Sequence, residues 1–417
     1  MRLRIAGFAG FAIATAVAAG LALATPLTAA PTASHQGFLY GTVETKSGGR
    51  YTGLLRWGKE EAFWDDLFNA SKRDQPATGK LPRGYRREAQ KIEVFGLEIT
   101  GPWERGWATR QFVARFGDIV EIRPRGGDRV DVEMKGGQVH ELDGGSNDVG
   151  ATVRVLDATL GEVKVEWERI RSIRFAATPA DVRPQGQRLR AVVQTAAGEF
   201  RGHLQWDSEE ALTGDLLDGE TDDGDLSIEM GRIRSIERDG RSASRVTLVD
   251  GRVLEMSGSN DVDSSIRGVL VADERFGRVE IPWDAFRRAE IEAAPDSGRG
   301  YDDYPAGRPL EAKVTAADGR SRSGRIAFDL DETASWELLN GVGDDVEYSI
   351  VFADVKSIRP LGRKRAEVEL RNGQKLTLEG QTDVSESNAG VAFLGPEKVE
   401  GAPDYLPWDE ITAIELR

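Results

Sequence analysis

A short polar phrase that ends in Asp-Val is the part of this chain whose residue types best suit chemistry. It occurs at 146–149 and 259–262 as the identical tetrad Ser-Asn-Asp-Val, and a third Asp-Val pair stands at 383–384. Asn and Asp at a turn commonly hydrogen-bond their own backbone, while their oxygen atoms also suit calcium. We interpret these residues as formers of a repeated structural turn, and calcium binding remains the alternative. The residues are Asn147, Asp148, Asn260, Asp261 and Asp383.

A second candidate is a pair of tryptophans that flank an arginine. Trp103, Arg105 and Trp107 lie in a stretch, 72–108, that the corresponding parts of the chain lack. An insertion in one copy of a repeat often maps to a functional loop. Exposed aromatic side chains beside an arginine suit a protein hot spot or stacking on a sugar. We therefore predict that these three residues bind a ligand or a partner.

Residues for nucleophilic catalysis are scarce. The chain has no cysteine and three histidines, His35, His140 and His203, and it lacks a Gly-x-Ser-x-Gly elbow. His203 stands between Gly202 and Leu204 on an alternating stretch, which favours a solvated side chain. The sequence predicts a protein that is not an enzyme and that needs no cofactor and no metal. A carboxylate-based hydrolase is the enzymatic alternative, and it would need paired acids about 5–10 Å apart in a cleft.

Three similar stretches must position these residues. Related opening phrases occur at 43–57, 192–207 and 314–329, and related closing phrases, each starting with a tryptophan, occur at 167–175, 283–291 and 408–416. A second closing phrase ends the first half of each copy, at 116–122, 230–236 and 352–358. Self-similarity over such lengths is typical of an array of like units. We predict three tandem repeats, each internally doubled.

Alternation of apolar and polar residues dominates these repeats. Stretches at 129–134, 245–249 and 366–370 alternate with period two and are each followed by a glycine turn. This pattern is typical of half-buried strands joined by tight hairpins. The five tryptophans at shared positions are expected in the core: Trp57, Trp167, Trp206, Trp283 and Trp408. The predicted fold class is all-β.

The opening phrase of each copy resembles the start of a small SH3-like or Sm-like β-barrel. In the second copy it contains Gly202, Leu204, Trp206 and Asp207. The resemblance covers about 30 residues of each half-repeat, and it implies that each repeat is a pair of small barrels. Sm proteins continue to an Asn that binds uracil, but 208–211 is acidic and holds no Asn. Bacterial SH3-like modules often bind cell-wall peptides or other proteins, which the resemblance implies as a function.

The expected domain boundaries follow from composition and from the repeats. Residues 1–30 have a basic start and an Ala-rich uncharged run, the form of a secretory signal peptide. Pro-, Gly- and Ala-rich stretches predict linkers. The full division is 1–30 signal peptide, 37–175 repeat 1 with the insertion 72–108, 176–188 linker, 189–292 repeat 2, 293–309 linker, and 310–417 repeat 3.

The net charge of the chain limits the partners that it is expected to bind. The formal net charge of −15 becomes −17 once the two arginines of the signal are removed, and such a chain repels phosphate backbones and anionic lipids. We therefore expect no nucleic-acid partner and a mature chain that does not span a membrane. The predicted function is an exported, periplasmic or secreted binding and scaffold protein of the bacterial envelope, whose partner is another protein. Binding of cell-wall or envelope polysaccharide is the alternative.

Overall fold

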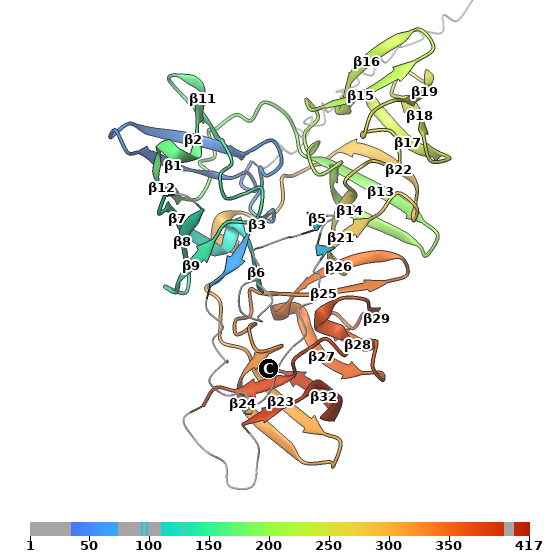
Figure 1. The fold of residues 1–417 in the computed structure, drawn as a ribbon. Helices are drawn as coiled ribbons and strands as arrows, with labels where there is room; N and C mark the ends of the chain where they lie inside the picture. Colours follow the sequence, from blue (N-terminus) through green and yellow to red (C-terminus); the bar gives the residue numbers. More distant parts are fainter. Residues whose placement is uncertain (1–34, 74–92, 95–96, 99–109, 127, 396–403) are drawn as a thin grey trace, which may run out of the picture. The chain divides into compact units, whose positions relative to one another are not determined.

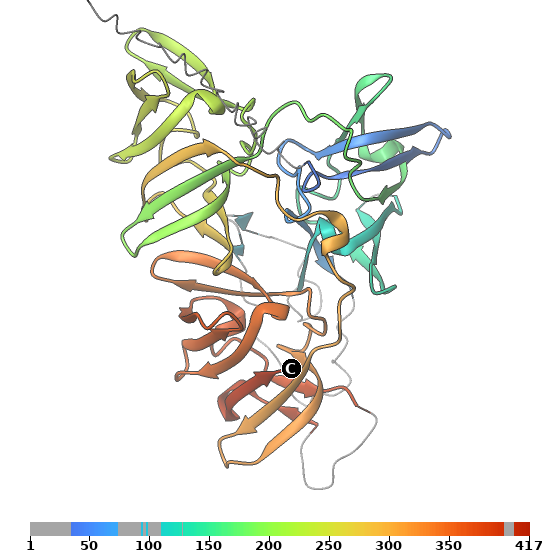
Figure 2. The ribbon, with the colours of Figure 1, turned by 180° about the vertical axis from the view of Figure 1, so that it is seen from behind.

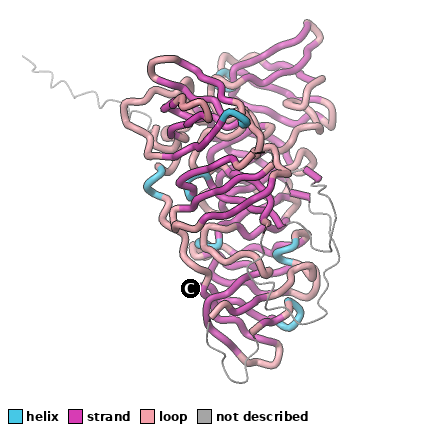
Figure 3. Tube along the Cα trace, turned by 60° about the vertical axis from the view of Figure 1, so that its left-hand side comes forward, coloured by secondary structure: helices cyan, strands magenta, loops and turns pink. Residues whose placement is uncertain are grey.

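The computed structural model describes residues 35–73, 93–94, 97–98, 110–126, 128–395 and 404–417. The predicted signal peptide at 1–30 and most of the insertion at 72–108 lie outside these residues. The described part is built of strands, and every helical element in it is a three-residue 3-10 turn. Figure 3 shows strands throughout, with these short turns between them. The predicted all-β class is confirmed.

The first large sheet is antiparallel and has ten strands in the order β11-β10-β2-β1-β12-β7-β8-β9-β3-β6. We call its strands segment 1. They are β1 (Tyr40–Thr45), β2 (Arg50–Trp57), β3 (Leu67–Lys72), β6 (Arg110–Arg115), β7 (Ile119–Pro124), β8 (Arg129–Met134), β9 (Val139–Asp143), β10 (Val153–Asp157), β11 (Gly161–Val165) and β12 (Ile170–Phe175). A separate two-stranded sheet consists of β4 (Glu93–Val94) and β5 (Leu97–Glu98).

The second sheet has twenty strands, which we divide into segment 2 and segment 3. Segment 2 comprises β13 (Leu189–Thr195), β14 (Glu199–Trp206), β15 (Leu216–Thr221), β16 (Gly224–Glu229), β17 (Ile233–Asp239), β18 (Ala243–Leu248), β19 (Val253–Ser257), β20 (Val269–Asp273), β21 (Gly277–Ile281) and β22 (Phe286–Ala293). Segment 3 comprises β23 (Glu311–Ala316), β24 (Ser321–Phe328), β25 (Leu338–Gly343), β26 (Val346–Val351), β27 (Val355–Pro360), β28 (Arg365–Leu370), β29 (Lys375–Glu379), β30 (Val391–Phe393), β31 (Tyr405–Leu406) and β32 (Ile411–Leu416).

Residue-by-residue pairing gives the same strand order in all three segments. Segment 2 runs β21-β20-β14-β13-β22-β17-β18-β19-β15-β16. Segment 3 runs β31-β30-β24-β23-β32-β27-β28-β29-β25-β26. Figures 1 and 2 show, from opposite sides, β13, β14 and β22 lying together in segment 2. The glycine turns predicted after 134, 249 and 370 are hairpin turns, as expected.

The strands form two large open sheets, and the expectation of separate closed barrels is wrong. Within segment 1 the two five-strand groups are joined because β12 pairs with β7, where Ile173 lies opposite Ile122. The pairs β22–β17 and β32–β27 make the same joint in segments 2 and 3. Segments 2 and 3 are joined in turn by β21 and β26. Strand edges that a closed barrel would pair internally are used here to extend a sheet.

Two glycines permit close approach of strands in the opening phrases. A Cβ atom on Gly53 would lie 2.0 Å from the carbonyl oxygen of Leu156, and one on Gly202 would lie 1.8 Å from that of Ala272. Any side chain would therefore separate β2 from β10 and β14 from β20. The corresponding Gly324 is less confined, since the nearest atom to its added Cβ lies 3.7 Å away.

Tryptophans fill the cores as predicted. Trp57 and Trp206 are fully buried, and the three closing-phrase tryptophans are at most 4% exposed. Trp64 and Trp336, which do not recur between the copies, are buried as well. Trp64 packs on Phe175 and Trp336 on Phe112. The contact between Trp336 and Phe112 joins segment 3 to segment 1.

Candidate functional site

The Asp of each Asp-Val phrase reaches a strand far away in the sequence. One carboxylate oxygen of Asp148 accepts the backbone N–H of Asn69 at 2.6 Å. Asp261 accepts the N–H of Asp218 at 2.7 Å, and Asp383 accepts that of Asn340, also at 2.7 Å. We expected bonds to the residues' own backbone, but the carboxylates fasten the turn to β3, β15 and β25. This is a structural contact that a turn motif alone does not specify.

The neighbouring asparagines face different groups. Asn147 donates from its amide to Glu60 at 2.8 Å, and Asn260 donates to Asp207. Both acceptors follow the aromatic residue that ends the opening phrase, Trp57 or Trp206. The phrase at 146–149 or 259–262 is thus bound to the turn after β2 or β14.

Two clusters of three carboxylates are present among the described residues. The side-chain oxygens of Asp207, Glu210 and Asp261 lie within 4.8 Å of one another, and a matching cluster consists of Asp329, Glu332 and Asp383. Asp207 and Asp329 hold positive φ angles of 46° and 44°. The corresponding residue of segment 1 is Gly58, with φ of 60°, so only Glu61 and Asp148 remain there.

Only the Asp-Val member of each cluster was predicted from the sequence as a site residue. The glutamate of each cluster could have been found from a recurring spacing. A Glu stands four residues after the aromatic in every copy: Glu61 after Trp57, Glu210 after Trp206 and Glu332 after Phe328. Carboxylate oxygens of such acids are ligands of the kind that hold Ca²⁺ or Mg²⁺.

Burial perturbs the titration of these clusters. In segment 2 it raises the pKa of Glu210 to about 9, and the charges of Asp261 and Asp207 act in the same direction. The pKa of Asp261 is raised to about 6, again mainly by burial. Burial also raises the pKa of Asp383 to about 7, with the charge of Asp329 adding to it. At neutral pH, Glu210 therefore keeps a proton, which lowers the mutual repulsion of the cluster.

Each complete cluster also faces an arginine. Arg267 lies 3.0 Å from Asp207 and donates its backbone N–H to the same carboxylate. Arg110, on β6 of segment 1, is paired with Asp329 and lies 3.0 Å from Asp331 of segment 3. The arginines thus pair with carboxylate oxygens that a bound metal cation would need as ligands. The second pair joins two segments through nearly buried charges.

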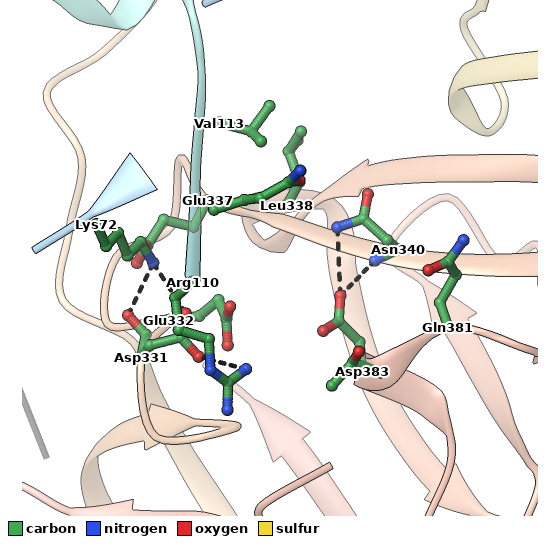
Figure 4. Close-up of a pocket in the computed structure, with 12 residues that line it drawn as sticks. Lys72, Arg110, Val113, Asp331, Glu332, Glu337, Leu338, Asn340, Gln381 and Asp383 are labelled. Atoms are coloured by element: carbon green, nitrogen blue, oxygen red, sulfur yellow. Dashed lines mark hydrogen bonds and ion pairs between the residues drawn. The ribbon is translucent and has the colours of Figure 1, made fainter. Parts of the chain in front are cut away.

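Lys72 strengthens the same junction between segments 1 and 3. Its ammonium group lies 2.7 Å from Glu337 and 3.3 Å from Asp331. Figure 4 shows these side chains beside the cavity. Although burial alone would lower it, the carboxylates of Glu337 and Asp331 raise the pKa of Lys72. The adjoining cavity measures about 70 Å³. This space admits a few water molecules but not a sugar ring.

A much larger cavity, of about 580 Å³, is lined by residues of all three segments. Leu67 comes from segment 1, Leu270 from segment 2 and Leu338 from segment 3. Arg188, which directly precedes β13, lines the cavity as well. His203 also lines it with a side chain that is 20% exposed, so the histidine that we expected in water is only partly solvated. Burial, with the nearby charge of Arg188, lowers the pKa of His203 to about 4. This histidine is therefore neutral at physiological pH.

The predicted binding residues Trp103, Arg105 and Trp107 lie outside the described residues. Among the residues that are described, none of the helices has the length and apolar character needed to cross a bilayer. The fold and site thus define an all-β protein with buried carboxylate clusters and a large cavity among the described residues. No protein-family model, curated protein or solved structure matches this chain.

Proposed function

We propose that this chain is an exported, non-enzymatic binding protein of the bacterial envelope, made of three tandem repeats, that holds a peptide segment of another protein. The observation that carries the proposal is the cavity of about 580 Å³ lined by all three segments. Its volume falls in the range of ordinary ligand pockets, about 300–1,000 Å³. The recurring order of ten strands supports the repeats. Its division into two five-strand groups supports an origin in paired SH3-like modules.

The cavity wall favours a peptide over other ligands. Cationic groups and anionic groups both line it, together with apolar side chains such as Leu270 and Leu338. A peptide offers charges of both signs and apolar groups, whereas a neutral polysaccharide offers mainly hydroxyls. The charged lining residues include Arg115, Arg188, Arg299, Asp65, Asp273 and Asp354.

The segments that line the cavity are fixed to one another, which limits the entropy lost on binding. Arg56 of segment 1 lies 2.7 Å from Asp215 and donates to the carbonyl oxygen of Glu209. Gln205 donates in return to the carbonyl oxygen of Glu60 at 3.1 Å. These reciprocal contacts hold segments 1 and 2 together. Lys72 and Arg110 hold segments 1 and 3 in the same way.

The carboxylate cluster of segment 3 borders a cavity of about 70 Å³, which is too small for a glycoside, and we favour peptide binding over hydrolysis for the acids that line the large cavity. The polysaccharide alternative depends on Trp103 and Trp107, outside the described residues. A single experiment separates it from the peptide proposal.

The test is crosslinking of the tagged protein in its native envelope, followed by mass spectrometry. We would compare the wild type with Ala272→Trp, which places an indole in the large cavity. Ala196→Trp, at an exposed turn, is the matched control. One dominant protein partner, kept by the control and lost in Ala272→Trp, would support the proposal. Sedimentation with purified cell wall and no protein partner would overturn it in favour of polysaccharide binding.

A further inference from the structure

Segments 2 and 3 are joined by a single antiparallel pair of edge strands. β21 is the last strand at one end of the order in segment 2, and β26 is the last at the opposite end in segment 3. Their register places Arg278 opposite Ser349, Val279 opposite Tyr348 and Glu280 opposite Glu347. We use this pair as the template for how the edge strands of two segments pair.

β16 is the counterpart of β26 in segment 2. Both close a hairpin over two aspartates, with Thr221 opposite Gly224 in one and Gly343 opposite Val346 in the other. Within the described residues β16 pairs with β15 alone, and all but one of its residues are exposed. β26, which is covered by β21, is mostly buried. β16 is thus an open edge whose equivalent is occupied elsewhere in the molecule.

β11 is the counterpart of β21 in segment 1. Each begins with a glycine of positive φ, 75° at Gly161 and 87° at Gly277, and continues with a charged residue, valine and a second charged residue. In the described part of the chain, β11 pairs with β10 alone. Its outer edge has the same free N–H and C=O groups that β21 uses to hold β26.

We propose that β11 of one copy of this chain pairs antiparallel with β16 of a second copy, in the register of β21 and β26. That register places Glu162 opposite Ser227, Val163 opposite Leu226 and Lys164 opposite Asp225. Leu226 is 37% exposed in the single chain and would be covered by Val163. This interface is independent of the large cavity and of the ligand proposed for it.

Charge favours this pairing over its template. Glu280 and Glu347 lie opposite one another in the β21–β26 pair, and burial together with the charge of Glu347 raises the pKa of Glu280 to about 8, because like charges directly opposite each other are unfavourable in a sheet. Lys164 and Asp225 replace them with opposite charges. Edge strands that carry charges normally resist pairing with arbitrary strands, so the complementary pair gives the interface its specificity.

The occupant is a second copy because one chain cannot satisfy both edges in the observed arrangement. The contact between Arg56 and Asp215 fixes segment 1 against segment 2, and in this arrangement no other described strand pairs with the outer edge of β11 or of β16. Each copy presents β11 and β16, one edge of each kind, in addition to the terminal strands β31 and β6, which also pair with one strand each among the described residues. Pairing between copies is therefore head to tail, and it extends unless two copies satisfy each other reciprocally.

The test is sedimentation velocity of the mature chain over about 1–200 μM, the range in which a modest edge-strand interface forms. We expect the wild type to self-associate as concentration rises. Lys164→Asp and Asp225→Lys should each weaken association about five- to tenfold, because each creates a like-charged pair. Lys46→Asp, at an exposed turn, is the charge-matched control and should associate as the wild type does.

Two further samples make the register itself testable. The double variant Lys164→Asp/Asp225→Lys restores opposite charges and should self-associate again. A mixture of the two single variants should associate as the wild type does, since both edge pairs that form between unlike chains bring opposite charges together. The proposal would be overturned if the wild type stayed monomeric at all concentrations. It would also be overturned if the single variants associated no more weakly than Lys46→Asp does, or if the double variant stayed dissociated.

Discussion

Asn388 donates from its side-chain amide to the carbonyl oxygen of Asp383 at 2.9 Å. In segments 1 and 2 the same carbonyl position is bound by a tryptophan, with Trp57 donating to Asp148 at 2.9 Å and Trp206 to Asp261 at 2.8 Å. Segment 3 has Phe328 at the tryptophan position, and phenylalanine has no donor. The buried carbonyl is therefore satisfied by a different residue, as buried polar groups require.

Asn388→Ala should destabilise the protein by about 1–3 kcal/mol, because it leaves the Asp383 carbonyl buried without a donor. It also removes the acceptor of the Gly390 N–H, at 2.7 Å. Thermal unfolding followed by circular dichroism measures the effect. The exposed substitution Gln374→Ala in the same segment is the control, and equal melting temperatures for the two variants would contradict the assigned role.

The stability of the wild type should fall as the pH rises from about 5 to 9 because of Glu210. Its pKa is raised to about 9 in the folded state, so the folded protein binds a proton that the unfolded chain has already released. Stability from this group is complete below the unfolded pKa and is lost through the folded one. Glu210→Gln should flatten the slope and stabilise the protein at pH 8 by about 1–3 kcal/mol.

Denaturant unfolding at pH 5, 7 and 9 measures this dependence, with the exposed Glu229→Gln as the control variant. Repeating the series with added Ca²⁺ tests whether the cluster binds a cation, which would raise the stability of the wild type and not that of Glu210→Gln. An unchanged slope in Glu210→Gln would show that this carboxyl is not the titrating group.

Lys72→Met should destabilise the protein by about 3–5 kcal/mol, because removing one partner of a buried ion pair strands the other charges. Glu337 and Asp331 are almost fully buried; Glu337 would lose this counter-charge, and Asp331 would keep only that of Arg110. Lys356, whose pair with Glu369 is exposed, provides the control. Lys356→Met should change the melting temperature only slightly, and a similar loss in both variants would contradict the importance of burial.

Gly202→Ala and Gly324→Ala form a matched pair from corresponding strands. The added methyl would lie 1.8 Å from a backbone oxygen in the first case and 3.7 Å from a phenylalanine carbon in the second. We expect Gly202→Ala to cost at least about 1–3 kcal/mol through overpacking and Gly324→Ala to be tolerated. Melting temperatures of the two variants measure the difference. Equal melting temperatures would mean that β14 and β20 can move apart without loss of stability.

Much of the local structure follows from the sequence. Alternation with period two fixed which residues of a strand such as β8 face the core, and the glycine turns placed its hairpin with β9. The tryptophans of the opening and closing phrases are buried as expected, because large apolar side chains at alternating positions have no other place in a thin sheet. These features depend on neighbours a few residues apart, which a single sequence displays.

The site could not be predicted to the same extent. Asp207 and Asp261 are 54 residues apart in the chain, and Arg110 meets Asp329 across more than 200. His203 was expected in water, but it is half-buried at the wall of a cavity that three segments form together.

The sequence by itself determined the strands, their turns, their inward faces and the threefold recurrence of phrases. Tertiary structure alone decided that the sheets stay open, that β21 meets β26, and which buried charges compensate one another. The physical reason is range: alternation and turn chemistry act between neighbours in the chain, whereas edge pairing and desolvation depend on groups that only folding brings together.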